Sequence, residues 1–125
     1  MTDLLTDARA RLTAMLDDVV RLIECESPSD DLAAISHSAD VVADVLGPRL
    51  AAAGLPKDPE RIVIDGVTHL RWRLGGPTRV LLLGHHDTVW PHGSLASHPA
   101  QIADGVLTGP GCYDMAIGLV QAAHA

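Results

Sequence analysis

The amino-acid sequence predicts an α/β protein in which a helical half is followed by strands. Apolar residues recur at three- and four-residue steps through the first part of the chain, which is typical of amphipathic helices. Short β-rich segments separated by glycine and proline follow. The third observation is the continuous apolar run Val80–Leu83, which ends at Gly84 and precedes a His85-His86-Asp87 cluster. Such a run is typical of a buried parallel strand, and polar residues at its end lie at the rim of a sheet.

Two helices are expected in the first half of the chain. Apolar residues at helical spacing predict the first one over roughly residues 3–25, and Ser27-Pro28-Ser29-Asp30 ends it and offers N-caps for the next. A second helical pattern runs from Ile35 to Leu50. Gly47-Pro48 interrupts this pattern, so either the helix kinks there or a separate last turn follows.

The segments after the helical half predict short strands and turns. Residues 61–64 are β-rich, and residues 69–74 alternate between apolar and polar side chains. Asp65-Gly66 between them is a plausible tight turn. Further along, residues 101–107 predict a small hairpin, and a helical pattern begins at about Met115.

Composition and charge narrow the classes of function. The chain has 125 residues and a formal net charge of −7, and its nine basic residues are scattered, so no nucleic-acid partner is expected. No apolar run approaches the ~20 residues that span a bilayer, so no membrane partner is expected. The acidic N-terminus lacks a signal-peptide pattern and the two cysteines make no disulfide framework, which predicts a cytoplasmic location. The chain stops inside an apolar helical pattern, which predicts an incomplete domain.

The cluster after the apolar run carries the clearest chemical signal. Extended backbone places His85 and Asp87 on one side and His86 on the other. An imidazole and a carboxylate at this spacing suit a metal ligand with its orienting partner, or two direct ligands. The alternative is a polar loop that merely closes a strand.

A second cluster supplies another carboxylate. Gly109-Pro110-Gly111 approaches Asp114, which precedes the last helical pattern. Glycines let the backbone turn sharply and come close to a ligand, whereas the aspartate alone is also a plausible helix cap. The two clusters in this order are more specific than either one.

Together these motifs resemble the co-catalytic zinc peptidase and deacylase family that includes glutamate carboxypeptidase, acetylornithine deacetylase, succinyl-diaminopimelate desuccinylase and aminoacylase. Gly109-Pro110-Gly111 is most similar to the glutamate carboxypeptidase-like branch, and Glu24-Cys25-Glu26-Ser27-Pro28-Ser29 resembles the family's I-x-S-P-S segment. The resemblance implies a three-layer zinc-peptidase-like sheet with flanking helices. Residues 1–125 would be the N-terminal half of its catalytic domain, with the dimerisation domain absent.

The resemblance also implies roles for three residues. His85 resembles the first zinc ligand, Asp87 the catalytic carboxylate that orients it, and Asp114 the aspartate that bridges two zinc ions. The implied cofactor is Zn²⁺, two ions in the complete site, with other divalent metals such as Co²⁺ as substitutes. The implied reaction is hydrolysis of an amide bond, of carboxypeptidase or N-acyl-amino-acid deacylase type, on a small peptide or N-acyl amino acid.

The sequence departs from the family pattern in two ways. Ala116 and Ile117 stand where the family has a lysine and a small residue. The family's general-base glutamate and its further ligands have no counterpart, since none of the three glutamates occupies a suitable position. We therefore expect weak or no metal affinity and no useful catalysis from this chain alone. The alternatives are a non-enzymatic truncated remnant and a split subunit completed by another chain, and a homodimer is a further expected partner.

The remaining candidate ligands are expected to have other roles. His86, on the opposite side from His85, is expected to support or pack, and Cys112 is expected to be structural. His92 and His98 lie in a loop near the predicted site. Three more histidines are expected at the surface or the edge of the core, namely His37, His69 and His124.

Overall fold

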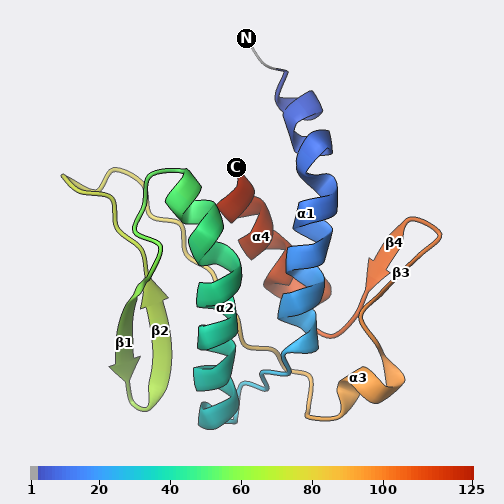
Figure 1. Ribbon diagram of the computed structural model, residues 1–125. Coiled ribbons are helices and arrows are strands. Elements are labelled where there is room, and N and C mark those ends of the chain that lie inside the picture. Colours follow the sequence, from blue (N-terminus) through green and yellow to red (C-terminus); the bar gives the residue numbers. More distant parts are fainter. Residues whose placement is uncertain (1–2) are drawn as a thin grey trace.

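The protein has a mixed α/β fold of helices and two small antiparallel sheets (Figure 1). The computed structural model describes residues 3–125, so the first two residues of the expected acidic N-terminus lie outside it. Helices α1 (Leu4–Glu24) and α2 (Leu32–Ala52) lie side by side and run in opposite directions. Helix α4 (Ile117–His124) packs against both.

Acidic side chains cap the two long helices. Asp3 accepts a hydrogen bond from the backbone N–H of Leu5 at the start of α1. Asp31 caps α2, because its Oδ1 accepts the N–H groups of Ala33 at 2.9 Å and Ala34 at 3.0 Å. Such caps satisfy N–H groups that have no partner inside the helix. The expected segment ends α1, but the residue that caps α2 is Asp31, directly after it.

Helix α2 continues through Gly47-Pro48 as one helix. Of the two alternatives, a kink or a separate last turn, the second is therefore excluded. A Cβ atom at Gly47 would lie 2.5 Å from the carbonyl oxygen of Lys57, so the returning chain needs a glycine here. The same oxygen accepts the indole N–H of Trp72 at 3.3 Å. The glycine therefore lets the chain after α2 fold back closely against the helix.

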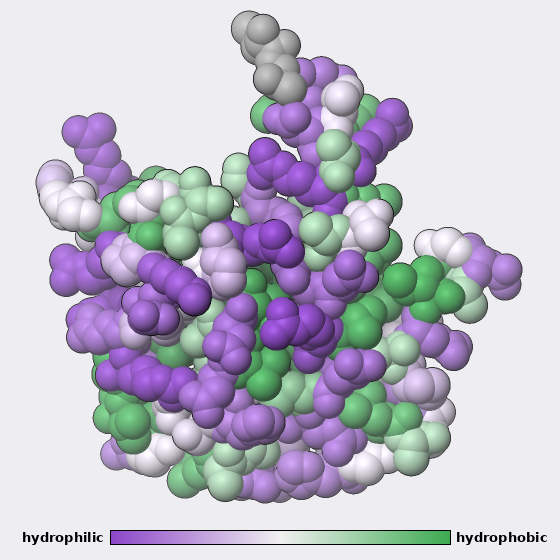
Figure 2. Space-filling model, viewed as in Figure 1, coloured by the Kyte–Doolittle hydropathy of each residue, from purple (hydrophilic) through white to green (hydrophobic). Residues whose placement is uncertain are grey.

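Both predicted hairpins form. Strands β1 (Glu60–Ile64) and β2 (Val67–Arg71) pair antiparallel around Asp65-Gly66, with Ile64 opposite Val67. Strands β3 (Gln101–Ala103) and β4 (Val106–Thr108) pair in the same way. Figure 1 shows the first hairpin beside α2 and the second beyond α1. On the face drawn in Figure 2, apolar surface gathers over these hairpins, where exposed side chains are Val63, Ile64, Ile102 and Val106.

The prediction of a buried parallel strand at Val80–Leu83 is wrong for this structure. The four residues belong to no strand and are between 75% and 87% exposed. A strand forms only where a neighbour pairs with its backbone, and within residues 3–125 each hairpin strand pairs only with its own partner. The run is apolar enough for a buried strand, but burial would need neighbouring strands that residues 3–125 do not supply.

The core lies between the three longer helices. Val19 of α1, Val45 of α2 and Val120 of α4 are each at most 2% exposed. Around them packs a cluster built from aliphatic residues, as the near absence of aromatic residues requires: Ile23, Val42, Leu46 and Ala123. Part of Leu70 and Trp72 also packs against this cluster, which anchors the β1–β2 hairpin. Aliphatic burial of this kind contributes about 1.5–3 kcal/mol for each large side chain.

A buried polar network ties the same helices together. Asp18 and His124 are 4% and 7% exposed, and His124 Nε2 lies 2.8 Å from Asp18 Oδ2. Arg49 Nε donates to the same carboxylate oxygen at 2.9 Å, and Arg11 donates to the carbonyl oxygen of His124. Burial acts to raise the pKa of Asp18, but its hydrogen bonds to Arg49 and His124 hold that pKa below its usual value. His124 was expected at the surface or core edge, and its burial corrects that expectation.

The connecting segments contain two shorter helical turns, α3 (Ser94–Ser97) and the π-helical turn η1 (Cys112–Ala116). In the part of the chain that the structure describes, no helix combines the length and the apolar character needed to cross a bilayer.

Candidate functional site

The segment between α1 and α2 holds the histidine cluster in place. Ser27 accepts the backbone N–H of Thr88 at 2.8 Å, and the carbonyl of Thr88 accepts the N–H of Ser29 at 2.9 Å. These bonds form a parallel bridge between residues 27–29 and the chain around Thr88. The Ser27 hydroxyl also donates to the carbonyl of His86 at 2.8 Å. Residues 85–88 are thus fixed in extended form against the helices, without a central strand.

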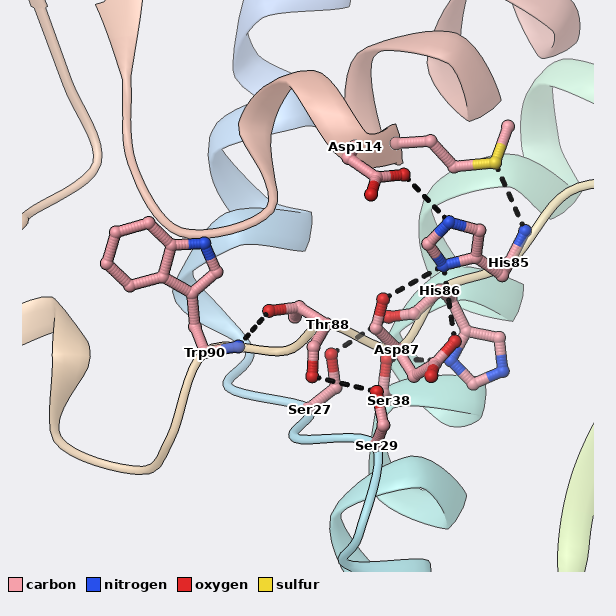
Figure 3. Close-up of polar contacts among 10 residues, drawn as sticks. Ser27, Ser29, Ser38, His85, His86, Asp87, Thr88, Trp90 and Asp114 are labelled. Atoms are coloured by element: carbon pink, nitrogen blue, oxygen red, sulfur yellow. Dashed lines mark hydrogen bonds and ion pairs between the residues drawn. The ribbon is translucent and has the colours of Figure 1, made fainter.

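His85 lies between two carboxylates (Figure 3). Its Nε2 is 2.9 Å from Oδ1 of Asp114, and its Nδ1 is 3.2 Å from Oδ1 of Asp87. Nδ1 is also 3.0 Å from the backbone oxygen of Asp87. The backbone N–H of His85 donates to Sδ of Met115 at 3.3 Å. Each ring nitrogen therefore faces acceptor oxygens, and the backbone is tied to the segment that carries Asp114.

Asp114 does not cap the last helix. It lies in η1 with φ −119° and ψ 90°, outside helical geometry, and the N-cap of α4 is Ala116. Gly111 before it has φ +69°, a conformation that glycine adopts without strain. The Asp114 side chain is 80% exposed and turns toward His85. Of the two interpretations of this aspartate, helix cap or partner of the histidine cluster, the geometry supports the second.

The histidine and the carboxylates of this cluster shift one another's pKa values. Partial burial acts to lower the pKa of His85, but hydrogen bonds to Asp114 and Asp87 outweigh it, so the pKa is raised. A hydrogen bond with Ser29, with help from His85, holds the pKa of Asp87 below its usual value. Asp87 is thus a stable carboxylate that faces Nδ1 of His85. The hydrogen bond to Asp114 needs a proton on Nε2. When that proton is lost, Asp87 would keep the remaining proton on Nδ1 and leave Nε2 as an electron-pair donor.

His86 lies apart from this cluster, as expected. Its Nδ1 is 3.0 Å from the hydroxyl oxygen of Ser38 in α2. Burial lowers the pKa of His86, so the neutral ring is favoured. His86 anchors the segment to α2, whereas His85 next to it faces Asp114.

Two further residues near the site were not foreseen as partners. Glu26 lines a cavity that also touches His85 and Asp87. Both of its oxygens are engaged, since they accept the N–H groups of Gly93 at 2.9 Å and Leu95 at 3.1 Å. These bonds, the one to Gly93 foremost, lower the pKa of Glu26. Glu26 therefore holds the loop around α3 and is not placed as a free base.

His92 fastens the same loop to α2. Its Nε2 lies 2.9 Å from Oδ2 of Asp31, and its Nδ1 lies 3.8 Å from Oε2 of Glu26. The hydrogen bond to Asp31 raises the pKa of His92. The sequence showed only that an acidic residue, Asp31, lies near a predicted helix start. The sequence does not reveal that a loop histidine reaches it.

The donor set around His85 has a definite limit. Residues 3–125 contain no group of three or more His, Cys, Asp and Glu side chains close enough to hold a metal ion. Cys112 donates its thiol to the carbonyl of Leu107 at 3.7 Å, and burial raises the pKa of that thiol, so it takes the expected structural role. His85 and Asp114 remain as a pair, with Asp87 behind the histidine.

Comparison of this chain with models of known protein families and with curated proteins finds no match.

Proposed function

We propose that His85, Asp87 and Asp114 form part of the site of a zinc-dependent hydrolase that cleaves an amide bond. The observation that carries this proposal is the position of the His85 imidazole between two carboxylates. Asp87 is its near neighbour in the sequence, and Asp114 comes from a distant part of the chain. In metal sites a ligating histidine commonly donates its other ring N–H to a carboxylate. Asp87 would have that orienting role, and His85 Nε2 and Asp114 would be the ligands.

The donor atoms suit zinc in type and spacing. Imidazole nitrogen and carboxylate oxygen are common zinc ligands, and two such ligands of one tetrahedral ion lie about 3.3 Å apart. His85 Nε2 and Asp114 Oδ1 are 2.9 Å apart as a hydrogen-bonded pair, so a slight increase in this distance would make room for an ion. The exposed side chain of Asp114 can make that movement without disturbing the core.

The chemistry follows from these roles. When bound, zinc would polarise the carbonyl group of the substrate and lower the pKa of a water molecule. A second zinc ion would strengthen both effects. Asp87 would keep His85 oriented, and Asp114 would be the second ligand. The proposed substrates are small peptides or N-acyl amino acids, with carboxypeptidase or deacylase action.

The described residues supply only part of such a site. A catalytic zinc ion takes about three protein ligands and a water, and hydrolysis needs a general base. Glu26 is the one glutamate in the cavity wall beside His85, and both of its oxygens already accept backbone N–H groups of the loop around α3. We therefore propose that polypeptide outside these 125 residues completes the ligand set.

The exposed Val80–Leu83 run supports the proposal that further polypeptide packs here, because an apolar run of this kind is normally covered. If neighbouring strands paired with both of its edges, it would become the central strand of the three-layer sheet that the resemblance implies. Its carboxyl end would then carry His85 at the rim of that sheet.

Zinc binding to the 125-residue chain tests the proposal. We expect binding weaker than micromolar that disappears in His85→Ala and in Asp114→Ala, as followed by NMR titration with ZnCl₂. His37→Ala is the matched control, because His37 is an exposed histidine of α2 that does not line the site cavities. Zinc binding that is unchanged in both site variants would contradict the proposal.

A further inference from the structure

A cavity of about 310 Å³ lies beside His85. One part of its wall carries the two site carboxylates, Asp87 and Asp114, and the other part carries Val89, Trp90 and Tyr113. Ligand cavities in proteins begin at about 300 Å³, so this one has room for a single side chain or a small acyl group. The cavity therefore joins the candidate reaction site to an apolar wall.

The apolar wall concentrates a scarce residue type. The chain contains two tryptophans, one tyrosine and no phenylalanine, yet Trp90 and Tyr113 both line this cavity. Tyr113 is 92% exposed and Val89 is 90% exposed. Apolar surface gains free energy when it leaves water, so large side chains gathered beside a polar site favour an apolar ligand that covers them.

The charges of the lining point the same way. Among the described residues, those that line this cavity include two aspartates and a histidine but no lysine or arginine. In the metal-free chain, a ligand with an acidic side chain would find no fixed cation there, and the carboxylates of Asp87 and Asp114 would repel it. A neutral apolar group meets neither penalty.

The part of the cavity wall at Trp90 is held in place before a ligand arrives. The backbone N–H of Trp90 donates to the hydroxyl of Thr88 at 2.8 Å. The indole ring lies against the imidazole of His98, with ring centroids 5.1 Å apart and planes tilted by 56°. A wall that is already ordered loses less conformational entropy on binding.

We propose that this cavity binds an apolar side chain or acyl group of the substrate, aromatic or branched aliphatic, and rejects acidic ones. The assignment of the ligand as substrate rests on the proposed hydrolase function. The preference for an apolar group rests on Val89, Trp90 and Tyr113, and the repulsion of acidic groups rests on Asp87 and Asp114 in the metal-free chain.

The test compares N-acetyl-L-phenylalanine with N-acetyl-L-glutamate, which share the acetyl group and the α-carboxylate. Each is titrated into the full 125-residue chain in EDTA and followed by NMR. We expect binding of the phenylalanine derivative to be at least about tenfold tighter, because aromatic contacts and the lack of repulsion act together. Trp90→Ala and Tyr113→Ser should each weaken it by about three- to tenfold and leave the glutamate derivative unchanged. Trp72→Phe is the matched control, since Trp72 lies outside the cavity lining.

Three outcomes would overturn the inference: equal or tighter binding of the glutamate derivative, no binding of either, or unchanged affinity in both cavity variants. Tyr113 is almost fully exposed, so its replacement leaves the core intact even if Trp90→Ala disturbs the loop. A parallel ZnCl₂ titration separates the two proposals. Zinc binding that is unchanged in His85→Ala and Asp114→Ala, with the apolar preference retained, contradicts only the hydrolase function. Zinc binding that needs these two residues, without the apolar preference, contradicts only this inference.

Discussion

Nε2 of His85 lies 2.9 Å from Oδ1 of Asp114, although 29 residues separate them in the chain. The contact exists because two local features meet. Hydrogen bonds to the segment between α1 and α2 fix the chain around His85, and the turn at Gly111 brings Asp114 back across it. Its geometry suits either a hydrogen bond or, with slight opening, a shared ion.

Removing the second carboxylate should weaken zinc binding without removing a ligand. In Asp87→Asn, Nδ1 of His85 loses the charged acceptor that orients the ring and raises its basicity. We expect zinc affinity to fall by about 10–100-fold, the usual effect of losing such a partner. NMR titration with ZnCl₂ measures it, and Asp30→Asn, an exposed aspartate outside the cavity linings, should leave the affinity unchanged. Equal losses in both variants would show a general charge effect instead of an orienting role.

Local patterns predicted the elements that depend on local interactions. The two long helices and both hairpins formed where periodicity and turn residues indicated, because capping, helical hydrogen bonds and tight turns involve neighbours in sequence. The Val80–Leu83 strand did not form, because pairing needs a partner that sequence pattern cannot supply. Extended backbone predicted that His85 and Asp87 lie on one side, whereas the closeness of Asp114 to them was expected from the resemblance.

The buried polar network left a signal that was overlooked. Asp18 stands three residues after Met15 and four before Leu22, on the apolar face of α1. His124 stands four residues after Val120 and shares the buried face of α4. A charged residue on an apolar stripe is almost never buried without a partner, so the pattern indicated an ion pair. Which helices would provide that partner could not be read from the sequence.

Asp18→Asn should destabilise the fold strongly. The substitution leaves Arg49 and His124 facing a neutral amide in a site where Asp18 is 4% exposed. Breaking a buried charged pair costs about 3–5 kcal/mol, and the partial exposure of Arg49 reduces that to about 2–4 kcal/mol. Urea unfolding measures the change. Asp17→Asn, at the exposed neighbouring position, should change stability by less than about 0.5 kcal/mol.

The contribution of Asp18 should also depend on pH in a defined direction. Its folded pKa lies below the ordinary value of 3.8, so its stabilising effect is present above that value and is lost as pH falls through the folded pKa. The difference in unfolding free energy between the native chain and Asp18→Asn should therefore shrink below about pH 4. Urea unfolding at a series of pH values measures it. A difference that stays constant down to the lowest pH at which the chain folds would refute the assignment.

His92 should give the opposite pH dependence. Its pKa is raised by the hydrogen bond to Asp31, so its contribution is fully present below the unfolded value and is lost as pH rises through the raised folded pKa. His92→Gln should therefore lower the melting temperature more at pH 6 than at pH 8. In Asp31→Asn the pKa of His92, followed by NMR, should fall toward its ordinary range, whereas Asp30→Asn should leave it in place. A His92 pKa that does not change in Asp31→Asn would exclude this ion pair.

Gly109→Ala should destabilise the approach to η1 through a direct clash. A Cβ atom at Gly109 would lie 2.7 Å from Cγ2 of Ile23, a buried core residue, and 3.2 Å from Cα of Ala100, and φ is +148°. Gly105→Ala is the matched control, because φ there is +77° but nothing lies within 4 Å of the added atom. Both variants place alanine at a positive φ, and +148° is less accessible to alanine than +77°, so the difference combines the clash with this added backbone cost. We expect Gly109→Ala to be less stable than Gly105→Ala by about 1–3 kcal/mol in urea unfolding. Equal stability of the two variants would mean that Ile23 can move aside, and that close packing at this turn does not fix the position of the segment that carries Asp114.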